Sequence, residues 1–219
     1  MHLAIFDLDG TLADTVPDIA WALGATLEEV RVPAPPLATV RQLVGDGSRV
    51  LIERALIRAG AVPDGERDPD RLLARFIVHY RDHLCVGSTL YPGVAEGLAA
   101  ARRVGLTLAV VTNKPGALAR GLLYELGETA SFVEVIGDGD GYPRKPDPTA
   151  ARAVAERLGA APAETTVVGD GLPDVRMARA LGARSIAAGW GYVAADELRE
   201  EGADIVAATP ADAFRALGV

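Results

Sequence analysis

The stretch Leu3-Ala4-Ile5-Phe6-Asp7-Leu8-Asp9-Gly10-Thr11 sets the architecture that we expect for this chain. It begins with an apolar run typical of a short buried strand, and Asp7 and Asp9 follow where that strand ends. In open parallel α/β sheets ligands bind beyond the carboxyl ends of the strands, so acids there can meet a metal ion or a substrate. Positions two apart in a strand point the same way. The pattern indicates an active site, although Asp and Gly also occur in ordinary turns.

The scarcity of lysine draws attention to two further segments. All but Lys114 and Lys145 of the 22 basic residues are arginine. A lysine in such a chain is expected where a compact ammonium is needed and a planar guanidinium would not substitute. Lys114 ends the strand-like run that begins at Val110, and Lys145 precedes two prolines that forbid a regular helix. Both are candidate site residues, with chance retention on the surface as the alternative.

A fourth segment adds two more acids. A β-rich run from Thr166 ends at Asp170, and Asp174 follows four residues later. If Pro173 opens a helix, Asp174 lies in its first turn. Acids at the ends of separate strands would repel one another, and a divalent cation with oxygen ligands relieves that repulsion. A bound Mg²⁺ is therefore predicted.

With these segments in order, the chain resembles the haloacid dehalogenase superfamily. The family pattern is Asp-x-Asp-x-Thr, a strand-end Ser or Thr, a Lys, and Gly-Asp-x-x-x-Asp. The resemblance is to the phosphoglycolate phosphatase branch in the segments 7–18, 90–94, 111–115, 143–148 and 189–192. One position departs from the pattern, because Gly171 stands where family members commonly have Ser or Thr.

The resemblance implies both a fold and a site. The fold is α/β, with a Rossmannoid core of parallel sheet flanked by helices and an inserted all-helical cap subdomain. Asp7 would be the nucleophile that forms an aspartyl-phosphate, and Asp9 the acid and base, carrying a proton when substrate binds. Mg²⁺ would be held by the side chains of Asp7 and Asp170 and the main-chain carbonyl of Asp9, with Asp174 bound through a water. The phosphoryl group would contact Thr112, the Asn113 amide, Lys145, which would also pair with Asp7, and Lys114 as a weaker candidate.

Changes of hydrophobic period predict where the domains meet. Residues 1–13 are expected to be strand and turn, and only helical patterns follow, over 18–30, 37–44, 48–59 and 69–84. Helix and strand then alternate, with strands near 107–111, 132–135, 166–168, 184–187 and 205–206. We therefore predict a discontinuous core of residues 1–13 and 87–219 and a cap of residues 14–86.

Substrate choice is expected to depend on the cap. Gly45-Asp46-Gly47 resembles the cap loop of the phosphatase branch, which places Gly47 facing the active site between two helices. Arg49 could reach a substrate carboxylate or simply cover helix surface. Phosphoglycolate is the first candidate substrate, from the resemblance alone. The run from Gly137 to Gly141 is interpreted as a flexible loop near the site, because Thr149 stands where a calcium loop would need its Glu.

Composition excludes several classes of partner. A net charge of −8 without a basic run argues against nucleic acid. No apolar stretch approaches the roughly 20 residues that span a bilayer. Cys85 is the only cysteine and cannot form an intrachain disulfide, which favours a reducing compartment. We expect a cytoplasmic protein, a monomer or homodimer, whose partner is a small phosphorylated metabolite.

Other activities of the same chemistry stay open. A phosphonate hydrolase would need a lysine in the cap, which has none, and a dehalogenase would not need Asp9, Asp170 and Asp174. A sugar phosphomutase or another small-metabolite phosphatase would use the same residues. A non-catalytic Mg²⁺-dependent phosphorylation switch would also use a phosphoacceptor Asp and a Lys, but such modules lack a helical insertion.

Overall fold

Strand β1 (Leu3–Phe6) lies in the middle of a parallel sheet, as its apolar sequence predicts. The computed structural model describes residues 2–219, and in that range the sheet has six strands in the order β5-β4-β1-β6-β7-β8. The other strands are β4 (Thr107–Pro115), β5 (Glu134–Asp138), β6 (Thr165–Gly169), β7 (Arg184–Ala188) and β8 (Ile205–Ala207). Each pair of neighbouring strands in this sheet is parallel, so all carboxyl ends share one edge of the sheet.

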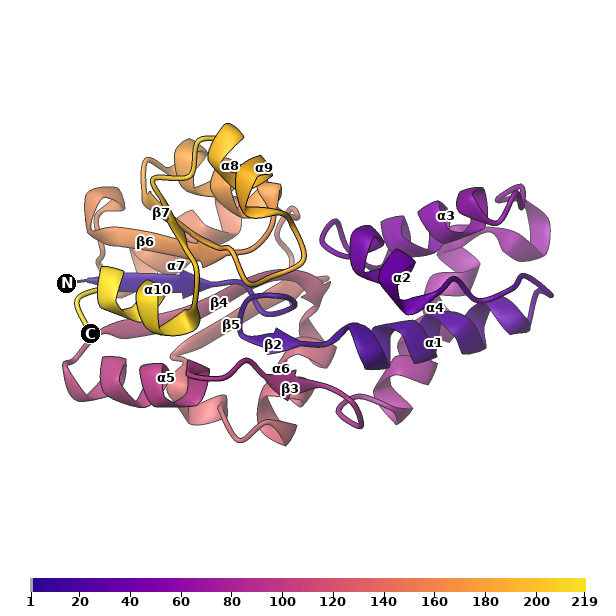
Figure 1. The fold of residues 1–219 in the computed structure, drawn as a ribbon, viewed down its shortest axis with the longest axis horizontal. Helices are drawn as coiled ribbons and strands as arrows, with labels where there is room; N and C mark the ends of the chain where they lie inside the picture. Colours follow the sequence, from indigo (N-terminus) through magenta and orange to yellow (C-terminus); the bar gives the residue numbers. More distant parts are fainter. Residues whose placement is uncertain (1) are drawn as a thin grey trace.

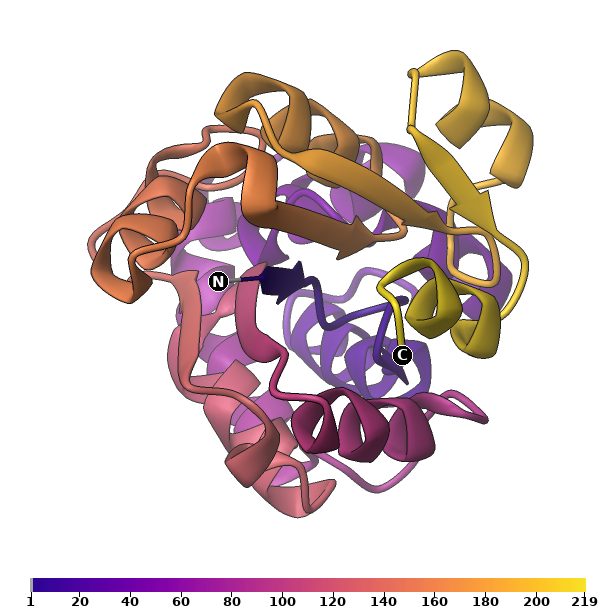
Figure 2. The ribbon, with the colours of Figure 1, turned by 90° about the vertical axis from the view of Figure 1, so that its left-hand side faces the viewer.

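Helices cover both faces of the sheet (Figures 1 and 2). They are α5 (Val94–Arg103), α6 (Gly116–Glu125), α7 (Thr149–Leu158), α8 (Leu172–Leu181), α9 (Ala195–Glu200) and α10 (Pro210–Ala216), with short 3₁₀ turns η2 (Thr129–Ser131) and η3 (Pro162–Glu164). Alternate residues of β1 serve opposite faces: Ala4 and Phe6 pack with α5, α6 and α10, whereas Leu3 and Ile5 pack with α7 and α8. Burial on both faces explains why β1 is continuously apolar.

A helical insertion lies beyond the carboxyl edge of the sheet (Figure 1). It comprises α1 (Val16–Glu28), α2 (Leu37–Leu43), α3 (Ser48–Arg58), η1 (Gly65–Arg67) and α4 (Pro69–Asp82). These helices share a hydrophobic core of their own, to which Leu23, Ile52 and Phe76 belong. The chain enters the insertion through β2 (Ala13–Asp14) and returns through β3 (Thr89–Leu90), which pair antiparallel and hold the two crossings side by side. The predicted α/β fold with an inserted set of helices is confirmed.

One predicted segment differs from the structure. The strand expected near 132–135 is β5 at Glu134–Asp138, so Gly137 and Asp138 belong to a strand and not to a flexible loop. The reason is close packing: a Cβ on Gly137 would lie 2.5 Å from the carbonyl oxygen of Lys114. Only glycine lets β5 approach the end of β4 at this point.

Two further features concern the helices. Thr209 caps α10, accepting a hydrogen bond from the Asp212 amide, and Pro210 is the first helical residue. Within residues 2–219, no helix combines the length and apolar character needed to cross a membrane.

Candidate active site

The carboxyl ends of three adjacent strands bring the predicted residues together. Asp7 follows β1, Thr112 to Lys114 lie at the end of β4, and Asp170 follows β6. Because β4 and β6 both pair with β1, these side chains meet at one place on the sheet edge. The Asp7 amide donates a hydrogen bond of 2.8 Å to the Val168 carbonyl, which extends the pairing of β1 with β6 as far as Asp7.

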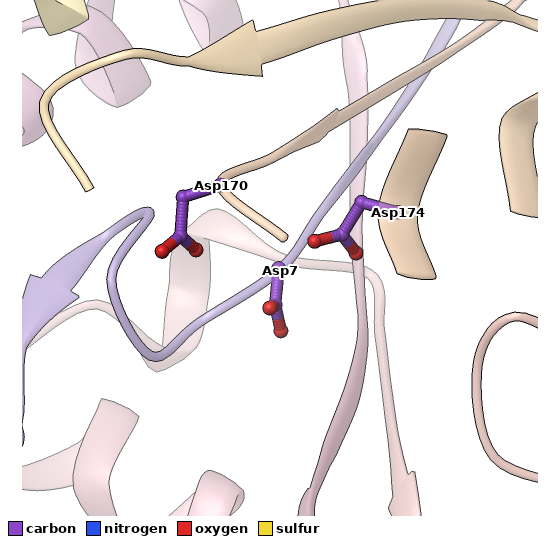
Figure 3. A group of neighbouring side chains, drawn as sticks. All are labelled: Asp7, Asp170 and Asp174. Atoms are coloured by element: carbon purple, nitrogen blue, oxygen red, sulfur yellow. The ribbon is translucent and has the colours of Figure 1, made fainter. Parts of the chain in front are cut away.

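Three carboxylates form an acidic cluster at this edge (Figure 3). Asp7, Asp170 and Asp174 each offer an oxygen, and these oxygens lie within 4.8 Å of one another. Burial, together with the nearby charge of Asp7, raises the pKa of Asp170 to about 8. Burial likewise raises the pKa of Asp174 to about 6, although Lys145 works in the opposite direction. Oxygen donors so close together fit a hard divalent cation.

Lys145 is the cation within this cluster. Its buried ammonium lies 2.8 Å from Oδ1 of Asp7 and 2.8 Å from Oδ1 of Asp174. Burial alone would lower its pKa, but the two carboxylates more than offset that effect and hold the pKa above its ordinary value. Lys145 is therefore a permanent ammonium that orients Asp7, in agreement with the pairing that the family resemblance implies.

Asp170 is held in place by groups from two other segments. Thr11 donates its hydroxyl to Oδ1 of Asp170 at 2.8 Å, and the Tyr192 amide donates to Oδ2 at 2.8 Å. Gly10 makes room for this carboxylate, because a Cβ there would lie 2.2 Å from Oδ2, and its φ of +83° is one that other residues rarely adopt. The Asp-x-Asp-x-Thr segment thus supports the acid of a distant strand.

Asp174 lies in the first turn of α8, as Pro173 predicts. Its Oδ2 accepts a hydrogen bond of 3.0 Å from the Gly171 amide. A Cβ at Gly171 would come within 3.2 Å of Pro173, which is a tight contact. The departure of Gly171 from the family pattern removes a hydroxyl but leaves Asp174 fixed by a main-chain amide.

Asp9 lies apart from the acidic cluster and faces the helical insertion. Its Oδ1 accepts hydrogen bonds from the Thr15 hydroxyl at 2.7 Å and from the Lys114 ammonium at 2.9 Å. Lys114 also contacts the hydroxyl of Tyr80 on α4 through a short hydrogen bond. Burial lowers the pKa of Lys114, and the Asp9 carboxylate partly offsets this. The second lysine therefore stands next to Asp9, whereas Lys145 stands next to Asp7.

Thr112 and Asn113 complete the edge between the two lysines. Oγ1 of Thr112 accepts a hydrogen bond of 3.2 Å from the Lys114 amide. The Asn113 side chain accepts from the Lys145 amide at 2.8 Å and donates to the Lys145 carbonyl at 3.2 Å. Asn113 therefore anchors the loop that carries Lys145, in addition to the phosphate contact expected of its amide.

A cavity lies between the sheet edge and the insertion and is open to solvent. Its empty space, including the solvent at its mouth, is about 430 Å³. The core lines it with Asp7, Asp9, Thr112, Asn113 and Lys114, and the insertion with Ile19, Val44, Gly45, Gly47, Ser48, Leu51, Phe76 and Tyr80. One wall is therefore charged and the other is mostly apolar. A pocket that sets a few charged groups against an apolar wall suits a small molecule.

The two cap residues predicted from sequence have different positions. Gly47 lines the cavity, as expected of the loop before α3. Arg49 does not: its guanidinium bonds Asp70 at 2.7 Å and Glu53 at 3.1 Å on the surface of the insertion. The position of Arg49, bound by two acids of the insertion outside the cavity, agrees with the alternative that it covers helix surface, and its role as a substrate ligand stays a prediction.

Two residues of the site were not singled out from sequence. Tyr80 follows Leu72 and Phe76 at helical spacing, so it resembles one more core residue of α4. The Tyr192 hydroxyl accepts a hydrogen bond of 2.9 Å from the Thr15 amide, and the Tyr192 amide donates to Asp170. For Tyr80, the sequence signal that could have identified it is a hydroxyl in an otherwise apolar helical stripe. For Tyr192, it is the Gly-Trp-Gly-Tyr segment.

Comparison with known families agrees with this arrangement. The family model described as haloacid dehalogenase-like hydrolase matches residues 1–182, a range that holds all three acids of the cluster and both lysines. The chain belongs to the haloacid dehalogenase-like hydrolase family. The family predicted from sequence is confirmed, and with it the hydrolase class of the enzyme.

Several members of this hydrolase family are similar over most of the chain. The phosphoglycolate phosphatase of Neisseria meningitidis is 40% identical over 193 residues, which is 85% of this chain and 80% of that protein. The phosphoglycolate phosphatase of Rhodospirillum rubrum is 36% identical over 217 residues, covering 98% of this chain and 88% of that protein. Among solved structures, a predicted phosphoglycolate phosphatase from Haemophilus somnus superposes with a TM-score of 0.91 at 29% identity, covering 99% and 98% of the two chains.

Proposed function

We propose that this hydrolase is a Mg²⁺-dependent phosphatase of small phosphomonoesters, with 2-phosphoglycolate as its first candidate substrate. The observation that carries the proposal is Asp7 at the end of β1, with the Lys145 ammonium 2.8 Å away and two further acids beside it. A carboxylate placed in this way suits covalent phosphoryl transfer. The names of the similar proteins support phosphoglycolate as the substrate.

In the first step Asp7 attacks phosphorus. A bond forms between the Asp7 carboxylate and phosphorus, the bond from phosphorus to the leaving oxygen breaks, and Asp9 gives that oxygen its proton. Both hydrogen bonds to the Asp7 carboxylate, from the Leu8 amide and from Lys145, end on Oδ1 and fix its orientation. Thr112, the Asn113 amide and Lys145 would receive the phosphoryl oxygens.

In the second step water hydrolyses the aspartyl-phosphate. Asp9 now takes a proton from the attacking water, the new oxygen–phosphorus bond forms, and the bond to Asp7 breaks, which releases phosphate and restores the enzyme. The Thr15 hydroxyl holds Asp9 at 2.7 Å, a position from which the same carboxyl group would serve both steps.

The donor set of the acidic cluster fits Mg²⁺. The ion would be held by the carboxylates of Asp7 and Asp170 and the main-chain carbonyl of Asp9, with Asp174 nearby. When bound, it would offset the repulsion between the Asp7 carboxylate and the phosphoryl group. Without it, the buried Asp170 would keep only the hydrogen bonds from Thr11 and Tyr192, whereas Asp174 would keep its ion pair with Lys145.

We further propose that the helical insertion is a cap. Its proposed limits are residues 14–86, which include the segments that connect its helices to the core. The cavity that it shares with the core supports this, because Asp7 and Asp9 form one wall and Phe76 and Tyr80 form the other. Closure of such a wall over the phosphoester would exclude bulk water during transfer.

The test is release of inorganic phosphate from 2-phosphoglycolate by the purified protein, with Mg²⁺ and with a chelator, against a panel of sugar phosphates. We expect release that requires Mg²⁺ and prefers 2-phosphoglycolate. Preference for another ester would overturn the substrate but keep the chemistry. A stable phosphorylated Asp7 without turnover, or transfer to a sugar, would instead establish the switch or the phosphomutase.

A further inference from the structure

Lys114 is a cation for which the phosphoryl chemistry has no need. Lys145 already pairs with Asp7, and its ammonium lies 2.8 Å from both Asp7 and Asp174. Lys114 is held instead by Asp9 and Tyr80, at the side of the cavity that the insertion covers. Among the described residues that line the cavity, Lys114 is the only one with a positive charge.

The position of Lys114 is defined by the group that it touches. In the proposed mechanism Asp9 protonates the oxygen of the leaving group, so that oxygen must lie within hydrogen-bond distance of Asp9. The Lys114 ammonium is 2.9 Å from Oδ1 of Asp9. Whatever is attached to the leaving oxygen through a short chain is therefore within reach of Lys114.

The ammonium also has donor capacity to spare. A lysine has three N–H donors, and the structure gives it two acceptors, Asp9 and the Tyr80 hydroxyl. The Lys114 side chain is only 1% exposed, so bulk water is a poor partner for the third donor. A buried ammonium with a free donor beside a cavity is suited to an anionic ligand.

The wall opposite the charged edge limits what that ligand can be. Ile19, Val44, Leu51 and Phe76 line it with apolar side chains, and Ser48 and Tyr80 are the described lining residues of the insertion that carry a hydroxyl. The several hydroxyl groups of a sugar would lose water there and find few hydrogen-bond partners, which is unfavourable. A short leaving group with one terminal anion fits both the wall and the cation.

We propose that Lys114, with Tyr80 holding its ammonium, binds a carboxylate on the leaving group of the substrate and so determines specificity for short phosphorylated acids. This inference rests on the proposed phosphatase function and assigns to a residue of the core a role that the sequence left open for Arg49. It makes Tyr80 a positioning residue supplied by the insertion, because its hydroxyl acts on substrate through Lys114.

The test compares two substrates of equal carbon number, 2-phosphoglycolate and ethyl phosphate, which differ in the carboxylate. The quantity measured is the ratio of their kcat/KM values. Lys114→Met should lower this ratio on the order of 100-fold, mainly through KM for 2-phosphoglycolate. Tyr80→Phe keeps the ring and should lower the ratio roughly 5-fold. Arg120→Met is the matched control: it removes one cation that pairs with Asp140 outside the cavity, and it should leave the ratio as in wild type.

Each result has a definite meaning. If Lys114→Met lowers kcat/KM equally for both substrates, the ammonium serves Asp9 and the inference is overturned. If the wild type hydrolyses both esters without preference, the inference also fails while the phosphatase function stands. If the wild type releases phosphate from neither, the proposed function itself has failed. Should Lys114→Met not fold, the Tyr80→Phe ratio makes the same distinction.

Discussion

At the scale of single residues, the proposed chemistry depends most on Asp7. Asn has nearly the same size but is not a nucleophile, so Asp7→Asn should lower kcat by roughly 10⁴-fold or more. The fold should remain intact, because the change removes one negative charge from a cluster of three acids. Phosphate release and the midpoint of thermal unfolding, measured on the same sample, check both parts.

The matched control for Asp7→Asn is Asp196→Asn, the same chemical change on the exposed start of α9. It should have wild-type activity. Appreciable turnover by Asp7→Asn would mean that another group attacks phosphorus, and the assignment of the nucleophile would have to be abandoned.

The residues of the site could be predicted to different extents. Asp7 and Asp170 could be identified because an apolar strand followed by a polar residue places that residue at the sheet edge, and Lys145 because lysine is scarce in this chain. Arg49 could not be placed, because its position depends on ion pairs with Asp70 and Glu53 that sequence spacing does not specify. Tyr80 was not distinguished because a helical stripe predicts burial and does not say what the buried hydroxyl meets.

At the scale of elements, Asp18 fastens helix α1 to the segment that returns from α4. Its buried carboxylate accepts hydrogen bonds from the Ser88 hydroxyl at 2.6 Å, the Ser88 amide at 2.7 Å and the Gly87 amide at 2.9 Å. His83 lies 3.0 Å from its Oδ1. Both connections between the insertion and the core are thus joined at one side chain.

Asp18→Asn should lower the free energy of unfolding by about 2–4 kcal/mol at pH 7, because the amide group of Asn would face N–H donors that need acceptors. Burial acts to raise the Asp18 pKa, but Ser88, Gly87 and His83 together hold it below the ordinary 3.8. The stabilisation is therefore complete above pH 3.8 and is lost as the pH falls through the lower, folded-state pKa.

Urea unfolding of the wild type and Asp18→Asn across this pH range measures the difference. We expect the two curves to converge in acid, where the wild-type carboxyl group also becomes neutral. A gap that stays constant from neutral pH to well below pH 3.8 would show that the Asp18 charge contributes nothing.

Element boundaries show where local sequence patterns no longer predict the structure. The helices of the insertion begin and end within a few residues of their predicted limits, because their apolar periodicity and prolines are local signals. Strand β5 is displaced toward Asp138 because its limits depend on contact with β4, and that contact requires Gly137. Tertiary packing overrode the local preference of the glycines for a loop.

At the scale of the whole molecule, the core and the insertion meet at the loop from Gly45 to Gly47. The Asn113 side chain donates to the Gly45 carbonyl at 3.0 Å, and Arg144 donates to the Asp46 carbonyl at 3.4 Å. Asn113 also anchors Lys145, so one side chain connects the proposed cap to the lysine that orients Asp7. The sequence placed this loop near the site, but only the folded chain shows what it touches.

Asn113→Ala should therefore loosen both the loop from Gly45 to Gly47 and the loop that carries Lys145. We expect kcat/KM for the best substrate to fall on the order of 10- to 100-fold, because neither Lys145 nor the cavity wall would be held in its position. Hydrogen exchange in residues 45–51 should become faster, since the loop loses a contact with the core. Arg144→Ala removes the other loop contact without touching the Asn113 bonds to Lys145, so it should raise exchange with a smaller loss of activity. If exchange in 45–51 is unchanged in both variants, the loop is held by the insertion alone and its two contacts with the core do not control closure.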